Sequence, residues 1–240
     1  MMRIDADTAV IVCAGPSLDR LTPRAWCELL GAGAIVAVNG APAALACRAV
    51  PFTFLAAMDL STGLADYVPE LLSIWRDTPA WRVASTKSFA IEAESHIFEV
   101  DSEHGVEGWA DDPQQGYKGG STGMIVANWL GNAWPDDDIA RAELRRTSER
   151  SGKPVPRRGF RKFAYVGLDM HPGNGTHAVG AGTHCSGFAR TDHYFSTCRS
   201  GWGKFCAEAA RRGIEVVNLT PDTGLAEMPR AEVPAEWVCA

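Results

Sequence analysis

The chain has 240 residues, of which 46% are hydrophobic and 22% are charged, and its formal net charge is −6. A chain of this length can bury the core of one α/β domain, and its negative charge argues against nonspecific nucleic-acid binding by the whole surface. The apolar runs are strand-sized and too short to cross a bilayer, and the acidic pair Asp5 and Asp7 does not fit a secretory signal peptide. We therefore expect a cytoplasmic protein with reduced cysteines.

The first predicted strand covers residues 8–14, a continuous apolar run typical of buried parallel strands. It ends in Gly15, Pro16 and Ser17, where the glycine lets the main chain approach a ligand and Ser17 adds a hydroxyl beside main-chain amides. Such a turn can hold a phosphate or a ribose, although many strand-to-helix turns need glycine for their geometry alone. A short helix is predicted to follow over residues 22–30.

Two further predicted strands, 34–38 and 51–58, end in an amide and a carboxylate, Asn39 and Asp59. Carboxyl ends of parallel strands meet at one edge of a sheet, so we expect both side chains to line the same site as Gly15. The competing interpretation is that they are ordinary turn residues.

The middle of the chain is predicted to contain a helix over 63–75 and short strands at 81–85 and 96–100. The acidic segment 101–120 has no hydrophobic period, which predicts a long surface loop that could act as a lid.

A glycine-rich turn then opens an apolar helix, and its residues Gly120, Ser121 and Thr122 are candidate nucleotide contacts. The free amides and the positive end of a helix dipole suit an anion. The spacing is not that of a Walker A motif, and Lys118 precedes the glycines, which excludes a P-loop kinase. Close packing of helix and sheet through small residues would explain the same pattern.

Residues 136–162 are predicted to form a basic insertion within a single domain that spans residues 1–240. Three aspartates open a helix on the side its dipole favours, and an excess of arginine and lysine follows. The segment is either a solvated helix and loop or an arm that binds an anionic acceptor, including a nucleic acid. For the second interpretation the candidate residues are Arg145, Arg146, Arg157 and Arg158.

The segment from 163 to 194 is the predicted centre of the site. A strand over 163–168 ends at Asp169, and a glycine-rich stretch read as loop carries four histidines: His171, His177, His184 and His193. Titratable side chains just past the carboxyl end of a strand lie where open α/β sheets bind ligands. A zinc site formed by these histidines with Cys185 and Cys198 is an alternative, but the spacings follow no common zinc pattern.

The chain is predicted to finish with a helix over 201–212, a core strand over 214–219 and a polar proline turn over 220–225. The order of these motifs resembles that of the bacterial sialyltransferases that cap lipooligosaccharides. The resemblance rests on the Gly-Pro-Ser-Leu turn, Asn39, the glycine and serine turn, the strand ending in Gly-Leu-Asp, the histidine segment and the proline turn. Related signatures occur in the archaeal hydroxymethylpterin diphosphokinase-like family.

The resemblance implies a Rossmann-like α/β fold, with a mostly parallel sheet and helices on both faces. It also implies that His193 is the general base. His171 and His177 stand where two tyrosines hold the departing phosphate in that family, and an imidazole N–H can donate to phosphate as a phenol does.

The nucleotide site departs from the family at two positions. Asn39 matches a nucleotide-contacting asparagine, whereas Asp59 and Ala14 stand where the family has asparagines. These departures concern the identity of the nucleotide donor more than the class of reaction.

We therefore expect a glycosyltransferase that moves a sugar from a nucleotide-sugar donor, with a CMP-sugar as the first candidate, to a hydroxyl of a glycan or other acceptor. No DxD motif of the usual metal-dependent kind is apparent, and Asp136 to Asp138 fit better as acids at the start of a helix. Neither a metal nor a further cofactor is therefore expected. Two alternatives stay open: a Mg²⁺-dependent diphosphate or nucleotidyl transferase, and a transferase that modifies nucleic acid held by the basic insertion. The sequence is compatible with a homo-oligomer.

Overall fold

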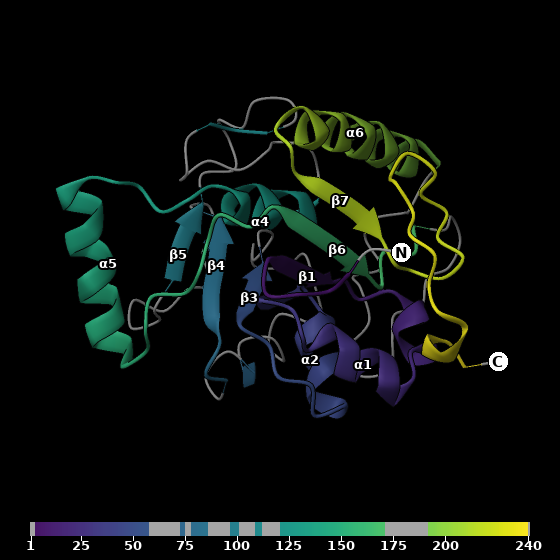
Figure 1. Ribbon diagram of the computed structural model, residues 1–240, viewed down its shortest axis with the longest axis horizontal. Helices are drawn as coiled ribbons and strands as arrows, with labels where there is room; N and C mark the ends of the chain where they lie inside the picture. Colours follow the sequence, from purple (N-terminus) through teal and green to yellow (C-terminus); the bar gives the residue numbers. More distant parts are fainter. Residues whose placement is uncertain are drawn as a thin grey trace.

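The fold is a single parallel β-sheet with helices on both of its faces (Figure 1). The computed structural model describes residues 3–57, 73–74, 78–85, 97–100, 109–111, 121–170 and 192–239, with the backbone alone for 84–85, 97–100 and 192–198. Seven strands lie in the order β5-β4-β3-β2-β1-β6-β7, and every neighbouring pair is parallel. The strands are β1 (Thr8–Val12), β2 (Ala34–Val38), β3 (Phe54–Ala57), β4 (Trp81–Ser85), β5 (Ile97–Val100), β6 (Lys162–Val166) and β7 (Glu215–Asn218).

The central strands are apolar throughout because both faces of the sheet are covered. All five residues of β1 and of β2 are buried. Alternate residues of a strand face opposite ways, so Ala9 and Ile11 join the core on one face of the sheet, and Val10 and Val12 join the core on the other.

The helices divide between the two faces. Figure 1 shows α1 (Pro23–Leu29) and α2 (Ala41–Cys47) on one side of the sheet, and α4 (Thr122–Gly131) and α6 (Asp192–Arg211) on the other. Thr22 caps α1 by accepting a hydrogen bond from the amide of Ala25. Short 3₁₀ helices, η1 (Pro16–Arg20) and η2 (Ala235–Trp237), lie after β1 and near the end of the chain.

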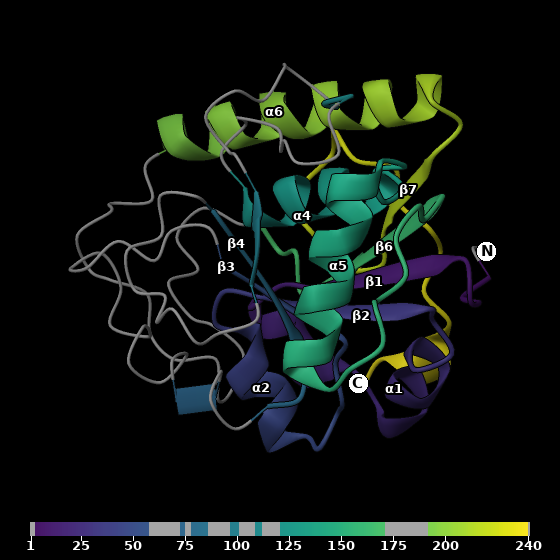
Figure 2. The ribbon, with the colours of Figure 1, turned by 90° about the vertical axis from the view of Figure 1, so that its left-hand side faces the viewer.

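One helix, α5 (Asp138–Ser151), stands apart from both layers, beside the end of the sheet that β4 and β5 form (Figures 1 and 2). Its cap is Asp137, whose side chain accepts from the amide of Ala140, and Thr147 is its buried residue. After the helix, Lys153 donates to the carbonyl of Ala80 at 3.3 Å and lies over the ring of Trp81. These contacts join the end of α5 to the start of β4.

The order of the strands reverses between β1 and β6. The chain builds β2 to β5 outward on one side of β1, and then returns to place β6 and β7 on the other side. Open α/β sheets bind ligands at such a switch point, at the carboxyl ends of the strands, because the two outgoing loops diverge there. The amides of Cys13 and Gly15 donate to the carbonyls of Val166 and Gly167, so the two strand ends stay joined beyond the last regular pair.

The expected fold class is confirmed, and two helices differ from expectation. The helix α2 was not predicted, because alanine-rich segments such as 41–47 have no distinct apolar face. The last helix begins at Asp192 rather than at residue 201, so His193 lies in the first turn of α6 and not in a loop. The prediction had placed the helix start at Gly201. Burial of Trp202 and Phe205 outweighs the low helix propensity of Gly201 and Gly203.

The predicted helix over 63–75 and loop over 101–120 lie outside the described residues, apart from 73–74 and 109–111. Among the helices that the structure describes, none combines the length and the apolar character needed to cross a membrane.

Candidate functional site

The main polar contact at the switch point joins the turns that follow β1 and β6. Ser17 donates its hydroxyl to Oδ2 of Asp169 at 2.7 Å and its amide to Oδ1 at 3.2 Å. Both oxygens of the carboxylate therefore accept from one residue at the start of η1. The Gly-Pro-Ser turn and the end of the Gly-Leu-Asp strand, identified separately in the sequence, form one unit.

Two glycines make this close approach feasible. Gly15 has an ordinary extended backbone, but a Cβ there would lie 1.8 Å from Oδ2 of Asp169 and 2.4 Å from the carbonyl oxygen of Gly167. Gly167 adopts φ of +70°, and its Cβ would lie 2.4 Å from the carbonyl oxygen of Cys13. The first glycine is required for space and the second for both space and conformation.

The carboxylate changes what the Gly-Pro-Ser turn can bind. An anion placed at the amide and hydroxyl of Ser17 would compete with Asp169 and be repelled by its charge. The same charge, together with burial as the larger cause, raises the pKa of the Cys13 thiol to about 12. A carboxylate accepts hydrogen bonds, so a group that donates them, such as a sugar hydroxyl, is chemically compatible with this turn.

Asn39 stands at the carboxyl end of β2 in a left-handed conformation, with φ of +53°, which asparagine tolerates better than most residues. The main-chain N–H of Asn39 donates to the carbonyl of Ala56 and continues the pairing of β2 with β3. The side-chain oxygen Oδ1 is buried and has no hydrogen-bond partner among the residues that the structure describes. A buried acceptor without a donor is costly, so this atom is a candidate ligand contact.

The start of α4 offers a second buried polar group. Ser121 is its N-cap residue, and Thr122 is 5% exposed with an Oγ1 that also lacks a hydrogen-bond partner in the described part of the chain. Packing fixes this end of the helix, since the Tyr165 hydroxyl on β6 donates to the carbonyl of Gly123 at 2.9 Å. A Cβ at Gly123 would lie 3.2 Å from the Tyr165 ring, so the small residues of this turn also serve helix–sheet packing.

The remaining residues expected at the site are described in part or not at all. Asp59, Gly120, His171 and His177 lie outside the described residues, and for His193 only its place in the backbone of α6 is described. In the part of the chain that the structure describes, no three His, Cys, Asp or Glu side chains are placed to hold a metal ion.

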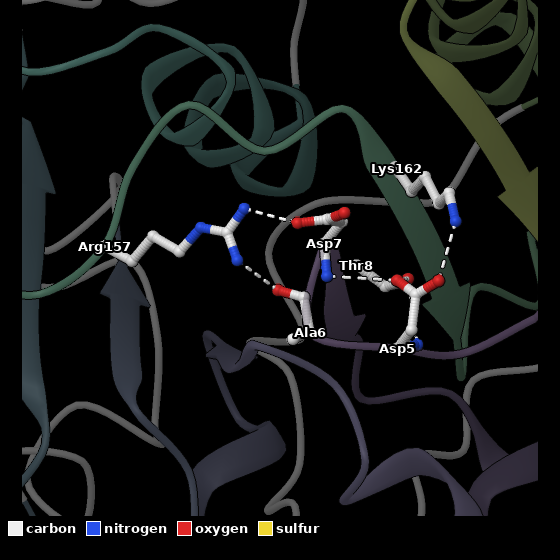
Figure 3. A network of polar contacts seen from close by, with 6 residues as sticks. All are labelled: Asp5, Ala6, Asp7, Thr8, Arg157 and Lys162. Carbon is white, nitrogen blue, oxygen red and sulfur yellow. Dashed lines mark hydrogen bonds and ion pairs between the residues drawn. The ribbon is translucent and has the colours of Figure 1, made fainter.

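The arginines expected to bind an acceptor have different surroundings. Arg145 and Arg146 are exposed on α5. Arg157 lies at the opposite edge of the sheet from the switch point, where it donates to the carbonyl of Ala6 and pairs with Asp7 at 2.6 Å (Figure 3). Arg157 thus contacts the residues that precede β1.

Arg158 is buried, not on the surface where an acceptor arm would need it. Its guanidinium lies 4.2 Å from the ring centre of Trp129 and 4.6 Å from that of Trp134, and Nε donates to the carbonyl of Trp129. Burial lowers its pKa. The structure therefore places Arg158 in the packing of α4.

The comparisons with known proteins concern the fold. No family model and no curated protein matches the chain. A solved structure, the MAf glycosyltransferase from Magnetospirillum magneticum AMB-1, matches with a TM-score of 0.51 and 14% identity.

The two proteins share a fold. The match covers the whole of this chain and 36% of the MAf chain, so this chain spans about a third of that protein. At this identity the likeness supports the Rossmann-like architecture, and activity has to be argued from the site.

Proposed function

We propose that this protein is a glycosyltransferase whose nucleotide-sugar donor lies across the carboxyl ends of β1, β2 and β6. The observation that carries the proposal is the carboxylate of Asp169, held by Ser17 at the switch point of the sheet. A shared fold with a glycosyltransferase supports the reaction class. The donor proposed first is a CMP-sugar, as in the sialyltransferases that the motif order resembles.

In this proposal the nucleoside lies at Asp169. A carboxylate accepts hydrogen bonds, and ribose hydroxyls are suitable donors to it. Asn39 Oδ1 would accept from the base, and the exocyclic amine of cytosine is a donor of the right kind. The phosphate would lie at the start of α4, where Thr122 Oγ1 can donate and the helix dipole favours negative charge.

The histidines supply the proposed chemistry. His193 removes the proton of the acceptor hydroxyl, because an imidazole titrates near neutral pH. His171 and His177 donate to the phosphate, whose negative charge grows as the glycosidic bond breaks. Arg145 and Arg146 would contact an anionic acceptor such as an acidic glycan.

The test measures nucleotide affinity by calorimetry and by the rise in melting temperature that ligand binding causes. CMP, UDP, GDP and ADP are compared first, and CMP is then compared with its 2′,3′-dideoxy analogue. The proposal expects CMP to bind best and the dideoxy analogue to bind about tenfold more weakly, a loss typical of a hydrogen bond to a charged group.

The matched variants are Asp169→Asn and Asp5→Asn, which change partly buried carboxylates at opposite edges of the sheet. Asp169→Asn should lower the affinity for CMP and abolish the difference in affinity between CMP and its dideoxy analogue. Asp5→Asn should leave the affinities for both nucleotides unchanged. Equal affinities in the wild type and Asp169→Asn would refute the placement of the nucleoside.

Turnover of CMP-sugars by His193→Ala, with and without EDTA, addresses the chemistry. The proposal expects a loss of at least a hundredfold in His193→Ala, the usual contribution of a general base. It also expects EDTA to have little effect on the wild type. Strong EDTA inhibition, with a diphosphate as the transferred group, would favour the Mg²⁺-dependent alternative.

A further inference from the structure

The turn that carries Asp169 is held in an unusual conformation. Gly167 and Met170, on either side of the turn, have φ of +70° and +50°, and the second value is unfavourable for a residue with a long side chain. Such a conformation persists where its surroundings hold it in place. The groups that hold it come from β7 and the proline turn that follows.

Three buried side chains take over where the pairing of β6 with β7 ends. The hydroxyl of Thr220 accepts from the amide of Leu168 at 2.9 Å, and that of Thr223 donates to the carbonyl of Leu168 at 2.7 Å. The side-chain amide of Asn218 donates to the same carbonyl at 3.4 Å. Each main-chain polar group of Leu168 therefore has a side-chain partner from this segment.

Thr223 and its neighbour also hold Asp169 itself. The carbonyl oxygen of Asp169 accepts from the amide of Gly224 at 2.7 Å and lies 3.1 Å from the Thr223 hydroxyl. The main chain of Asp169 is thus held from the proline turn after β7, while its carboxylate is held by Ser17 after β1.

Further hydrogen bonds join these three residues to one another and to the turn. Thr223 Oγ1 accepts from Asn218 Nδ2 and from the amide of Leu225, both at 3.2 Å, and Asn218 Oδ1 accepts from the amide of Thr220 at 2.9 Å. All three residues are less than 5% exposed. A buried polar network in which each group is satisfied specifies one geometry, because any shift leaves costly unpaired groups.

We propose that Thr223, with Asn218 and Thr220, is a positioning residue that sets the Asp169 carboxylate at the place where it meets Ser17 and the donor. The part concerning the donor rests on the proposed function. Thr223 acts through the main chain of Leu168 and Asp169 and contacts no substrate. It would therefore govern affinity without taking part in the chemistry.

The experiment compares Thr223→Val, which removes the hydroxyl at nearly constant shape, with Thr223→Ser, which keeps it. Thr8→Val is the matched control, since Thr8 is also fully buried and its hydroxyl also donates to an oxygen and accepts from an amide, at the opposite edge of the sheet. Two quantities are measured: hydrogen exchange at the amide of Ser17, which donates to the Asp169 carboxylate, and the dissociation constant for CMP.

Thr223→Val should speed hydrogen exchange at the Ser17 amide at least tenfold relative to amides inside β1. It should also raise the dissociation constant for CMP by a similar factor. Thr223→Ser should restore both values. Thr8→Val should lower overall stability and leave both values near those of the wild type. If Thr223→Val does not fold, Thr220→Val, which removes the acceptor of the Leu168 amide, should give the same pattern.

Unchanged protection of Ser17 in Thr223→Val, or an equal change in Thr8→Val, would overturn the positioning role. The exchange measurement needs no ligand, so it decides this point even if the wild type binds no nucleotide. Absence of binding in the wild type would count against the proposed function alone.

Discussion

A Cβ on Gly15 would lie 1.8 Å from Oδ2 of Asp169, a distance that no two nonbonded atoms of this kind can keep. The turn after β1 and the turn after β6 are therefore fitted to each other. Their contact is the part of the proposed site that the structure defines most completely.

Gly15→Ala should destabilise the protein by about 3 kcal/mol, the upper part of the usual range for overpacking. The backbone of Gly15 suits alanine, so the whole loss would come from contact with Asp169 and with the Gly167 carbonyl. Urea denaturation measures it. Because the carbonyl would still obstruct the methyl group, adding Asp169→Ala should recover little of the loss.

Gly203→Ala is the control for this substitution. Gly203 lies inside α6, and among the described residues the nearest atom outside its own helix would be 3.7 Å from an added Cβ. Alanine there should stabilise the protein by about 0.5 to 1 kcal/mol through helix propensity. Equal losses in the two variants would contradict the steric argument.

The ion pair between Asp5 and Lys162 predicts a pH dependence of stability (Figure 3). The hydrogen bond between them is the main cause that lowers the pKa of Asp5 and raises that of Lys162. The Asp5 carboxylate stabilises the folded protein at pH values above its unfolded pKa. This stabilisation is lost as the pH falls through the lowered folded pKa. Lys162 stabilises the folded protein at pH values below its unfolded pKa. This stabilisation is lost as the pH rises through the raised folded pKa.

Lys162→Met should therefore be less stable than the wild type by a constant amount near neutral pH. The difference should shrink in acid, below about pH 4, as Asp5 is protonated. The midpoints of urea unfolding from pH 2 to pH 9 measure this difference in stability. Asp5→Asn should also differ from the wild type near neutral pH and approach it in acid. A difference that persists at pH 2 would mean that the stem of Lys162, rather than its charge, stabilises the fold.

The five cysteines whose side chains are described are free thiols, and they should differ in reactivity. Burial is the main cause that raises the pKa of Cys13 and of Cys206 to about 12. At pH 8 only about one thiol in ten thousand at these positions would be ionised, and the thiolate is the reactive form.

Alkylation followed by peptide mapping should therefore label Cys27, Cys47 and Cys239, which are exposed, well before Cys13 and Cys206. Labelling of the slow pair should rise steeply in urea, because unfolding removes the protection. Rapid labelling of Cys13 in the folded protein would contradict its described surroundings.

Arg158→Ala should cost about 3 kcal/mol, because it removes packing against two indole rings and hydrogen bonds to the carbonyl of Trp129. Arg158→Lys should recover little, since an ammonium group cannot replace a planar guanidinium at such a site. Tryptophan fluorescence during urea unfolding measures both. Arg145→Ala, at an exposed position on α5, should change stability by less than about 0.5 kcal/mol.

The sequence predicted the architecture well because the apolar runs of β1, β2 and β6 are short, continuous and bounded by glycine, proline or asparagine. It also placed Ser17 and Asp169 at the same edge of the sheet. It did not reveal that their side chains bind each other, because a contact between distant residues depends on which strands are neighbours.

The same limit applies to Thr220 and Thr223, which were predicted as part of a polar turn, and to Asn218, which was predicted inside the last core strand. Threonine suits any turn, and the hydrogen bonds of these residues to Leu168 arise from the pairing of β6 with β7. Arg158 was grouped with its basic neighbours because composition does not distinguish a buried guanidinium from a solvated one.

Ser17 and Asp169 are 152 positions apart in the chain, and β6 joins the sheet after the five strands that precede it in sequence. During synthesis the first half of the site emerges long before the second. A nascent chain that ends before residue 162 holds the Gly-Pro-Ser turn without its carboxylate and cannot bind the donor as proposed. Loop closure over such a separation is slow, so the capacity to bind would arrive with the final stage of folding.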